Sequence, residues 1–158
     1  MIELYEFSIR ALVNDNDVRA FLADAMGIDH SQIMSVATFW DSAESRQGKF
    51  VGMEVYNSNS GFKTLCKWRQ TWNLQDIEFF QLASYASGKF NSEVAIGNFL
   101  ELQNVSTDQF IVITPAQQFY RAYAVTNTEV FDTAPVDNEL YDVERFMKQE
   151  RTAKRKQP

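Results

Sequence analysis

The hydrophobic residues of this chain recur at two spacings, which predict two kinds of element. Val18, Phe21 and Leu22 recur at the three- and four-residue spacing of one helical face. We therefore expect a helix over about 16–26, preceded by capping residues and ended by Gly27 as its C-terminal cap.

Segments with alternating or dense β-branched and aromatic residues predict strands. The expected strands cover 2–13, 32–40, 49–57, 92–104, 109–115 and 118–131. A polar loop, DSAESRQG, separates the second strand from the third, which predicts an antiparallel hairpin with a long connection. Gly97 is expected to bend the strand over 92–104.

The stretch GFKTLCKWRQTW predicts a helix over about 60–72. Helical spacing places four of its residues on one apolar face, namely Phe62, Leu65, Cys66 and Trp72. Lys63 and Lys67 fall on another face, toward water. Trp68 precedes Trp72 by one turn, so the two indoles should be neighbours.

Segment 74–87 fits either a helix or a strand, because its apolar residues satisfy both spacings, and Gly88 would cap either element. A last amphipathic helix is predicted over 139–150. Its acidic residues come early and its basic residues late, which is the distribution that the helix dipole favours.

This order of elements predicts an α+β fold. We expect a single domain over 1–150, with a mostly antiparallel sheet of about five or six strands and three or four helices. Residues 151–158 are expected to form a basic, flexible C-terminal tail. The length of 158 residues is that of one ordinary domain.

Formal charge is divided unevenly along the chain. Residues 145–158 hold six basic residues and one acid, whereas the other 144 residues hold nine basic residues and 20 acids. An acidic body attracts basic proteins and repels nucleic acid and anionic membranes. No apolar run approaches the roughly 18 residues that span a bilayer, and the first ten residues lack a signal-peptide pattern. We expect a cytoplasmic protein with a basic protein partner, with nucleic acid disfavoured and no membrane partner.

Few residues offer catalytic or metal-binding chemistry. The chain has one histidine, His30, and one cysteine, Cys66, which are too few for a histidine- or cysteine-based zinc site. No nucleophile elbow, phosphate-binding loop or dinucleotide fingerprint occurs. We therefore expect no catalytic residue, no metal and no cofactor. An enzyme of unrecognised type remains an alternative, using carboxylates or Cys66, whose sequence neighbours are basic.

Acidic residues concentrate late in the body, since residues 91–144 hold nine acids and a single basic residue, Arg121. An unpaired carboxylate is costly to bury, so these acids should face water, close together at one end of the sheet. Six residues form the predicted partner-binding surface: Glu129, Asp132, Asp137, Glu139, Tyr141 and Asp142.

A second candidate surface lies on the predicted helix over 60–72 and comprises Lys63, Lys67, Trp68 and Arg69. Basic and aromatic side chains together can stack on single-stranded bases, and Trp and Arg are also enriched at protein interfaces. A nucleic-acid-associated protein that uses the segment Lys63–Trp72 and the basic tail is therefore a further alternative.

In size, acidity and aromatic content the chain resembles the small intracellular immunity proteins of bacterial toxin–immunity systems. This resemblance covers the acidic body and not the basic tail, and small phage-encoded inhibitors share it. It implies a non-enzymatic protein that neutralises or regulates a basic partner, such as a toxin nuclease domain, by binding over its active site.

Overall fold

The computed structural model describes residues 2–42, 47–97, 109–125 and 130–156, with the side chains of 154–156 left out. By its internal contacts the chain divides into two compact units, Met1–Leu74 and Gln75–Pro158, here called unit 1 and unit 2. The boundary between them falls inside the range predicted to form a single domain.

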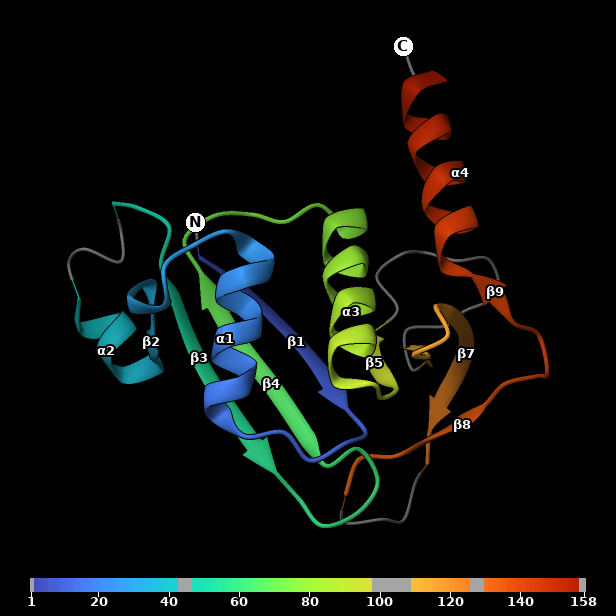
Figure 1. Cartoon of the computed structure of the whole chain (residues 1–158), viewed down its shortest axis with the longest axis horizontal. Helices are drawn as coiled ribbons and strands as arrows, with labels where there is room; N and C mark the ends of the chain where they lie inside the picture. Colours follow the sequence, from blue (N-terminus) through green and yellow to red (C-terminus); the bar gives the residue numbers. More distant parts are fainter. Residues whose placement is uncertain (1, 43–46, 98–108, 126–129, 157–158) are drawn as a thin grey trace. The chain divides into compact units, whose positions relative to one another are not determined.

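Unit 1 is a small sheet with helices (Figure 1). Its elements are β1 (Glu3–Ile9), α1 (Asp15–Met26), a 3-10 helix (His30–Gln32), β2 (Ile33–Ser35), α2 (Val36–Asp41), β3 (Val51–Asn57) and β4 (Thr64–Gln70). The strand order is β2-β3-β4-β1. Strand β4 runs antiparallel to both β1 and β3, whereas β2 runs parallel to β3.

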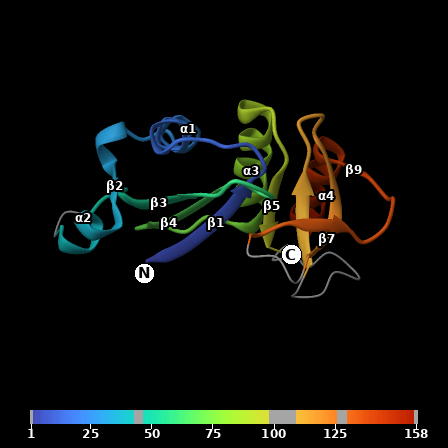
Figure 2. The same ribbon diagram turned by 90° about the horizontal axis from the view of Figure 1, so that it is seen from below.

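The first predicted helix is confirmed. The Asn14 side chain accepts a hydrogen bond from the Asp17 backbone N–H, and Gly27 ends α1 in the left-handed conformation with φ 66°. Helix α1 covers one face of the sheet formed by β1, β3 and β4 (Figure 2). On that face the Phe7 ring meets the Phe21 ring edge-on at 6.5 Å.

The helix predicted over 60–72 is wrong, because residues 64–70 form strand β4. Its buried residues alternate with half-buried ones, at a period of two rather than 3.6. The four buried positions are Thr64, Cys66, Trp68 and Gln70. Pairing with a strand on each side imposes this alternation and overrides the helical spacing of Phe62, Leu65 and Trp72.

The antiparallel hairpin predicted from 32–40 and 49–57 is also wrong. Strand β2 ends at Ser35, whose side chain accepts a hydrogen bond from the Thr38 N–H and starts helix α2. This helix turns the chain, so that β2 pairs with β3 in parallel. Phe39 of α2 is fully buried against the backbone of Gly52 in β3.

In its described residues unit 2 comprises five strands and two helices. Its elements are α3 (Asp76–Phe90), β5 (Val94–Gly97), β6 (Gln109–Ile113), β7 (Gln118–Ala124), β8 (Thr133–Pro135), β9 (Tyr141–Asp142) and α4 (Val143–Lys156). The strand order is β5-β6-β7-β8, and all of these pairs are antiparallel. Strand β9 also pairs antiparallel with β7, at Gln118 and Phe119.

Three ends of elements in unit 2 differ from the sequence prediction. Segment 74–87 is a helix, and it continues past Gly88 to a cap at Asn91 with φ 48°. The last helix begins at Val143 instead of 139, because 141–142 form β9. It continues to Lys156 and so includes residues that were assigned to the tail.

An aromatic cluster holds the elements of unit 2 together. The rings of Phe80 from α3, Phe119 from β7 and Phe146 from α4 meet pairwise at 5.2 to 5.3 Å. Tyr141 stacks on Phe119 at 5.1 Å. This packing fixes the start of α4 and the strand before it against the sheet.

The α+β fold is confirmed, with nine strands and four α-helices in the described residues. More strands are present than the five or six predicted, because 64–70 form β4 instead of the predicted helix and because β8 and β9 are too short to show a periodic pattern. Of the helices described, none combines the length and the apolar character needed to cross a membrane.

Candidate partner-binding site

Arg121 lies at the centre of the predicted acidic surface. It projects from β7 on the face that also carries its cross-strand partner Ile111, and its side chain is 11% exposed. Its guanidinium forms ion pairs with the carboxylate of Asp137 and, at 3.9 Å, with that of Glu139. Two of the predicted acidic residues therefore share one nearly buried cation.

These contacts hold the loop over 136–140 in one conformation. The Val136 N–H donates to the backbone carbonyl of Arg121 at 2.9 Å, and the Glu139 N–H donates to the Asp137 carboxylate at 2.9 Å. The loop is thus tied to β7 through both main chain and side chain. A surface fixed in this way loses little conformational entropy when a partner binds.

Tyr141 and Asp142 continue this surface toward α4. The pKa of the Tyr141 phenol is raised above its ordinary value. Burial of part of the side chain is the larger cause, and its hydrogen bond to Glu139 is the second. Tyr141 therefore stays protonated and acts as a donor. The exposed carboxylate of Asp142 accepts a hydrogen bond from the Arg145 N–H at 2.8 Å, in the first turn of α4.

A shallow hollow of about 380 Å³ borders the same residues. It is lined by Gln118, Leu140, Tyr141, Asp142, Arg145, Phe146 and Gln149. Leu140 is 55% exposed although it is apolar. The hollow therefore brings an exposed apolar side chain and an aromatic ring beside a carboxylate and the Arg145 side chain.

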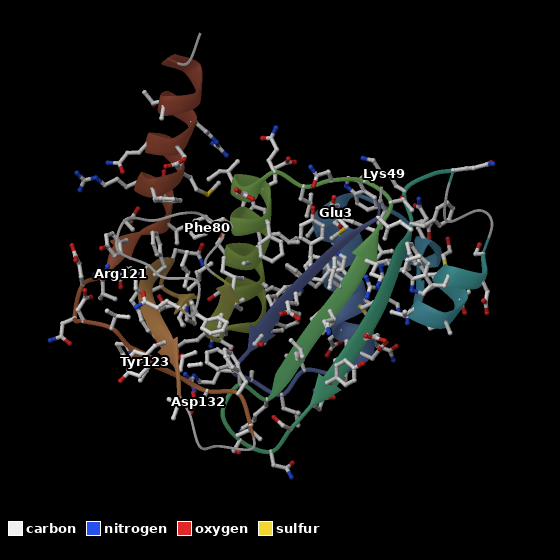
Figure 3. The ribbon with its side chains drawn as sticks, turned by 180° about the vertical axis from the view of Figure 1, so that it is seen from behind. Glu3, Lys49, Phe80, Arg121, Tyr123 and Asp132 are labelled. Carbon is white, nitrogen blue, oxygen red and sulfur yellow. The ribbon has the colours of Figure 1, made fainter. Side chains whose placement is uncertain are left out.

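The structure separates Asp132 from the other predicted acidic residues. Asp132 follows the loop at the Ala124 end of β7, where its carbonyl accepts from the Val125 N–H, whereas Asp142 pairs with Gln118 at the other end. Seven strand residues span about 20 Å, and Figure 3 shows Asp132 beyond Tyr123, away from α4. Glu129 lies outside the described residues.

We call the four predicted residues that lie together, with Leu140, the acidic surface: Asp137, Glu139, Leu140, Tyr141 and Asp142. The role of Arg121 in organising this surface was not among the sequence predictions. One signal was present, because a single basic residue in a strand at an inward position requires an acidic partner when it is buried. No sequence pattern indicated that Leu140 would be exposed.

The second predicted surface is not assembled. Trp68 is fully buried, and its indole N–H donates to Gln70 at 2.9 Å within the core of unit 1. Lys67 and Arg69 are on the opposite face of β4 from Trp68. Trp68 therefore cannot stack on a base or anchor a partner beside these basic residues.

The basic residues of β4 have other neighbours. Lys67 lies in register between Glu6 of β1 and Glu54 of β3. The guanidinium of Arg69 lies 5.6 Å from the centre of the Trp40 ring. Lys67 therefore has an acidic residue beside it on each neighbouring strand, and Arg69 lies near an aromatic ring of unit 1.

Cys66 and His30 do not form a catalytic site. Cys66 is buried on the core face of β4, and burial raises the pKa of its thiol, so the reactive thiolate is disfavoured. His30 lies exposed in the 3-10 helix. Within the described parts of the chain, no group of three or more His, Cys, Asp or Glu side chains could hold a metal ion.

Comparison with known proteins gives no relative. No protein-family model matches the chain, and neither a curated protein nor a solved structure is significantly similar to it.

Proposed function

We propose that this chain is a non-enzymatic binding protein that captures a basic protein partner through the acidic surface. The observation that carries the proposal is the nearly buried Arg121, which fixes Asp137 and Glu139 beside an apolar contact residue and a hollow. The single charge of Arg121 neutralises only one of the two carboxylates, so the loop keeps a negative charge while the ion pairs fix its conformation.

Different residues of the acidic surface would act in the encounter with the partner and in the lasting contact. The exposed carboxylates attract a basic protein over a distance and raise the rate of encounter. Leu140 and the Tyr141 ring offer apolar area for lasting contact. A lysine or arginine of the partner that enters the hollow would meet the Asp142 carboxylate and the ring of Tyr141.

The class of partner follows from the charge of the surface and from the resemblance to immunity proteins. A toxin domain that acts on nucleic acid carries a basic surface, which an acidic inhibitor can cover. The burial of Cys66 supports a binding protein over an enzyme that uses this thiol. A cytoplasmic location in a bacterial cell belongs to the same proposal.

The proposal is tested by capture from extracts of the native host at low salt, followed by association kinetics with the purified partner. Leu140→Lys places a positive charge at the centre of the acidic surface and removes its apolar contact. We expect the affinity to fall tenfold or more, as at an interface hot spot.

The matched control is Leu12→Lys, because Leu12 is also an exposed leucine, at 65%, and belongs to unit 1. It makes the same chemical change at a residue that is not part of the acidic surface and should leave the affinity unchanged. Recovery of no basic protein, or equal affinity of the two variants for a recovered one, would overturn the proposal.

A further inference from the structure

A second hollow in unit 2 is lined by α3 and α4, here called the interhelical hollow. The two helices are neighbours in this unit (Figure 1), and the rings of Phe80 and Phe146 meet between them at 5.2 Å. The interhelical hollow has a volume of about 330 Å³ and shares no lining residue with the hollow of the acidic surface. Its volume is at the lower end of the range for small-molecule sites, about 300–1,000 Å³.

Part of the lining of the interhelical hollow is apolar. Val143 and Met147 lie one turn apart on α4 and are 4% and 8% exposed. Tyr85 of α3 adds an aromatic ring, and this residue is exposed. A flat apolar molecule could therefore contact two aliphatic side chains and a ring, and the Met147 sulfur favours an aromatic neighbour.

Neutral side chains of the hollow retain hydrogen-bond donors. The Gln81 Nε2 group donates to the Tyr85 hydroxyl at 2.6 Å, so the Tyr85 O–H is left to donate. The Gln117 Nε2 group donates to the Ser84 carbonyl at 3.1 Å, which leaves its second N–H. Gln117 has φ 62°, a conformation that favours glycine, so its side chain is held at the hollow at a cost in backbone strain.

The charged residues of the hollow leave one positive charge uncompensated. Glu144 pairs with Lys148 at 3.1 Å. Arg151 lies four residues after Met147, or about 6 Å along the helix axis, and has no acidic partner in the part of the chain that the structure describes. A guanidinium can bind a carboxylate through two parallel N–H···O hydrogen bonds. The hollow is therefore complementary in charge to an occupant with one negative charge.

We propose that the interhelical hollow binds a small aromatic carboxylate. The ring lies against Val143, Met147 and Tyr85, and the carboxylate accepts hydrogen bonds from Arg151 and from the free N–H of Gln117. No protein side chain combines a flat ring with a carboxylate, which favours a free small molecule over a segment of a partner protein. This site goes beyond capture of a basic protein and uses no residue of the acidic surface.

The test is titration of the nitrogen-15-labelled full chain with phenylacetate, followed through the backbone amide signals in NMR spectra. We expect saturable shifts at residues that line the hollow, among them Ser84, Gln117 and Met147. Phenylacetamide has the same ring without the charge and should bind about tenfold more weakly, because a hydrogen bond to a charged group contributes more than a neutral one.

Arg151→Gln keeps a good helix former and removes the guanidinium. The affinity for phenylacetate should fall about tenfold and become similar to that for phenylacetamide, whose own affinity should not change. The matched control is Lys89→Gln, because Lys89 is exposed in unit 2 and is not among the residues lining the hollow. It removes the same charge and should leave both affinities unchanged. Glu144→Gln frees Lys148 from its ion pair and should raise the affinity for phenylacetate.

The proposal is overturned if phenylacetate causes no saturable shifts at the hollow, or if the two probes bind the unchanged chain equally. An equal effect of Arg151→Gln and Lys89→Gln would also overturn it, because the charge of Arg151 would then act only through the net charge. Tighter binding of a short peptide that ends in phenylalanine would contradict it as well, since the hollow would then receive the C-terminus of a protein.

Discussion

At the scale of single residues, Arg121 determines how the acidic surface behaves. A cation that is nearly buried is tolerated when carboxylates pair with it, and both of its partners come from the loop over 136–140. Asp137 and Glu139 therefore contribute to the fold as well as to the proposed binding surface. Reversing the charge of these two residues cannot be expected to leave the fold intact.

Asp137→Lys is expected to lower the free energy of unfolding by about 2 kcal/mol. The change leaves Arg121 without its nearer carboxylate and adds a like charge beside it, an effect that is reduced because Asp137 itself is partly exposed. Urea unfolding measures the loss. Asp24→Lys, at an exposed position in the last turn of α1, is the control and should cost little, because a cation there suits the helix dipole. Equal stability of the two variants would show that the ion pair with Arg121 contributes nothing.

At the scale of elements, the sequence predicts those parts whose pattern is local. The helix α1 carries its own caps in Asn14 and Gly27, so its bounds follow from the sequence. The sequence does not determine strand β4 in this way, because Phe62, Leu65 and Trp72 fit a helical face. Only pairing with β1 and β3 selects the strand, in which Cys66 and Trp68 alternate with half-buried neighbours. Tertiary contacts override local spacing in such a segment.

The acidic surface follows the same rule. Asp137, Glu139, Tyr141 and Asp142 are close in sequence, and the structure keeps them together. Asp132 is also close in sequence, but β8 carries the chain along the edge of β7 between it and the others. The sequence therefore predicts that the surface is acidic. Which residues belong to the surface depends on β8, whose three residues are too few to show a periodic pattern.

Gly52→Ala tests the packing of α2 on β3. A Cβ atom at Gly52 would lie 2.6 Å from the Cβ of the fully buried Phe39, so the helix must shift. We expect a loss of about 1–3 kcal/mol in the free energy of unfolding, as for an overpacked core. Gly97→Ala in β5 is the control, because a Cβ there meets nothing within 4 Å. The packing described for α2 would be contradicted if thermal unfolding of the two variants were the same.

At the scale of the whole molecule, acidic and basic residues are separated along the chain. Unit 1 holds seven basic residues and nine acids. Unit 2 holds 11 acids and two basic residues up to residue 144, followed by the basic part of α4. The acidic surface and the basic half of α4 therefore belong to one unit and contribute fields of opposite sign to any approaching partner.

This arrangement predicts that the basic part of α4 slows the association of a basic partner. Replacing Arg151, Lys154, Arg155 and Lys156 by Gln removes four positive charges and changes the formal net charge from −6 to −10. The association rate with a captured basic partner should then rise several-fold at low salt, because the repulsive part of the field is removed.

Stopped-flow association measured at several salt concentrations checks this prediction, with Leu140→Lys as the reference for a weakened acidic surface. The gain in rate should disappear as salt approaches about 1 M, where the Debye length is about 3 Å. A slower association of the four-glutamine variant would mean that the basic half of α4 contacts the protein partner directly. In that case the two surfaces would form one interface, and the partner would carry acidic residues next to its basic ones.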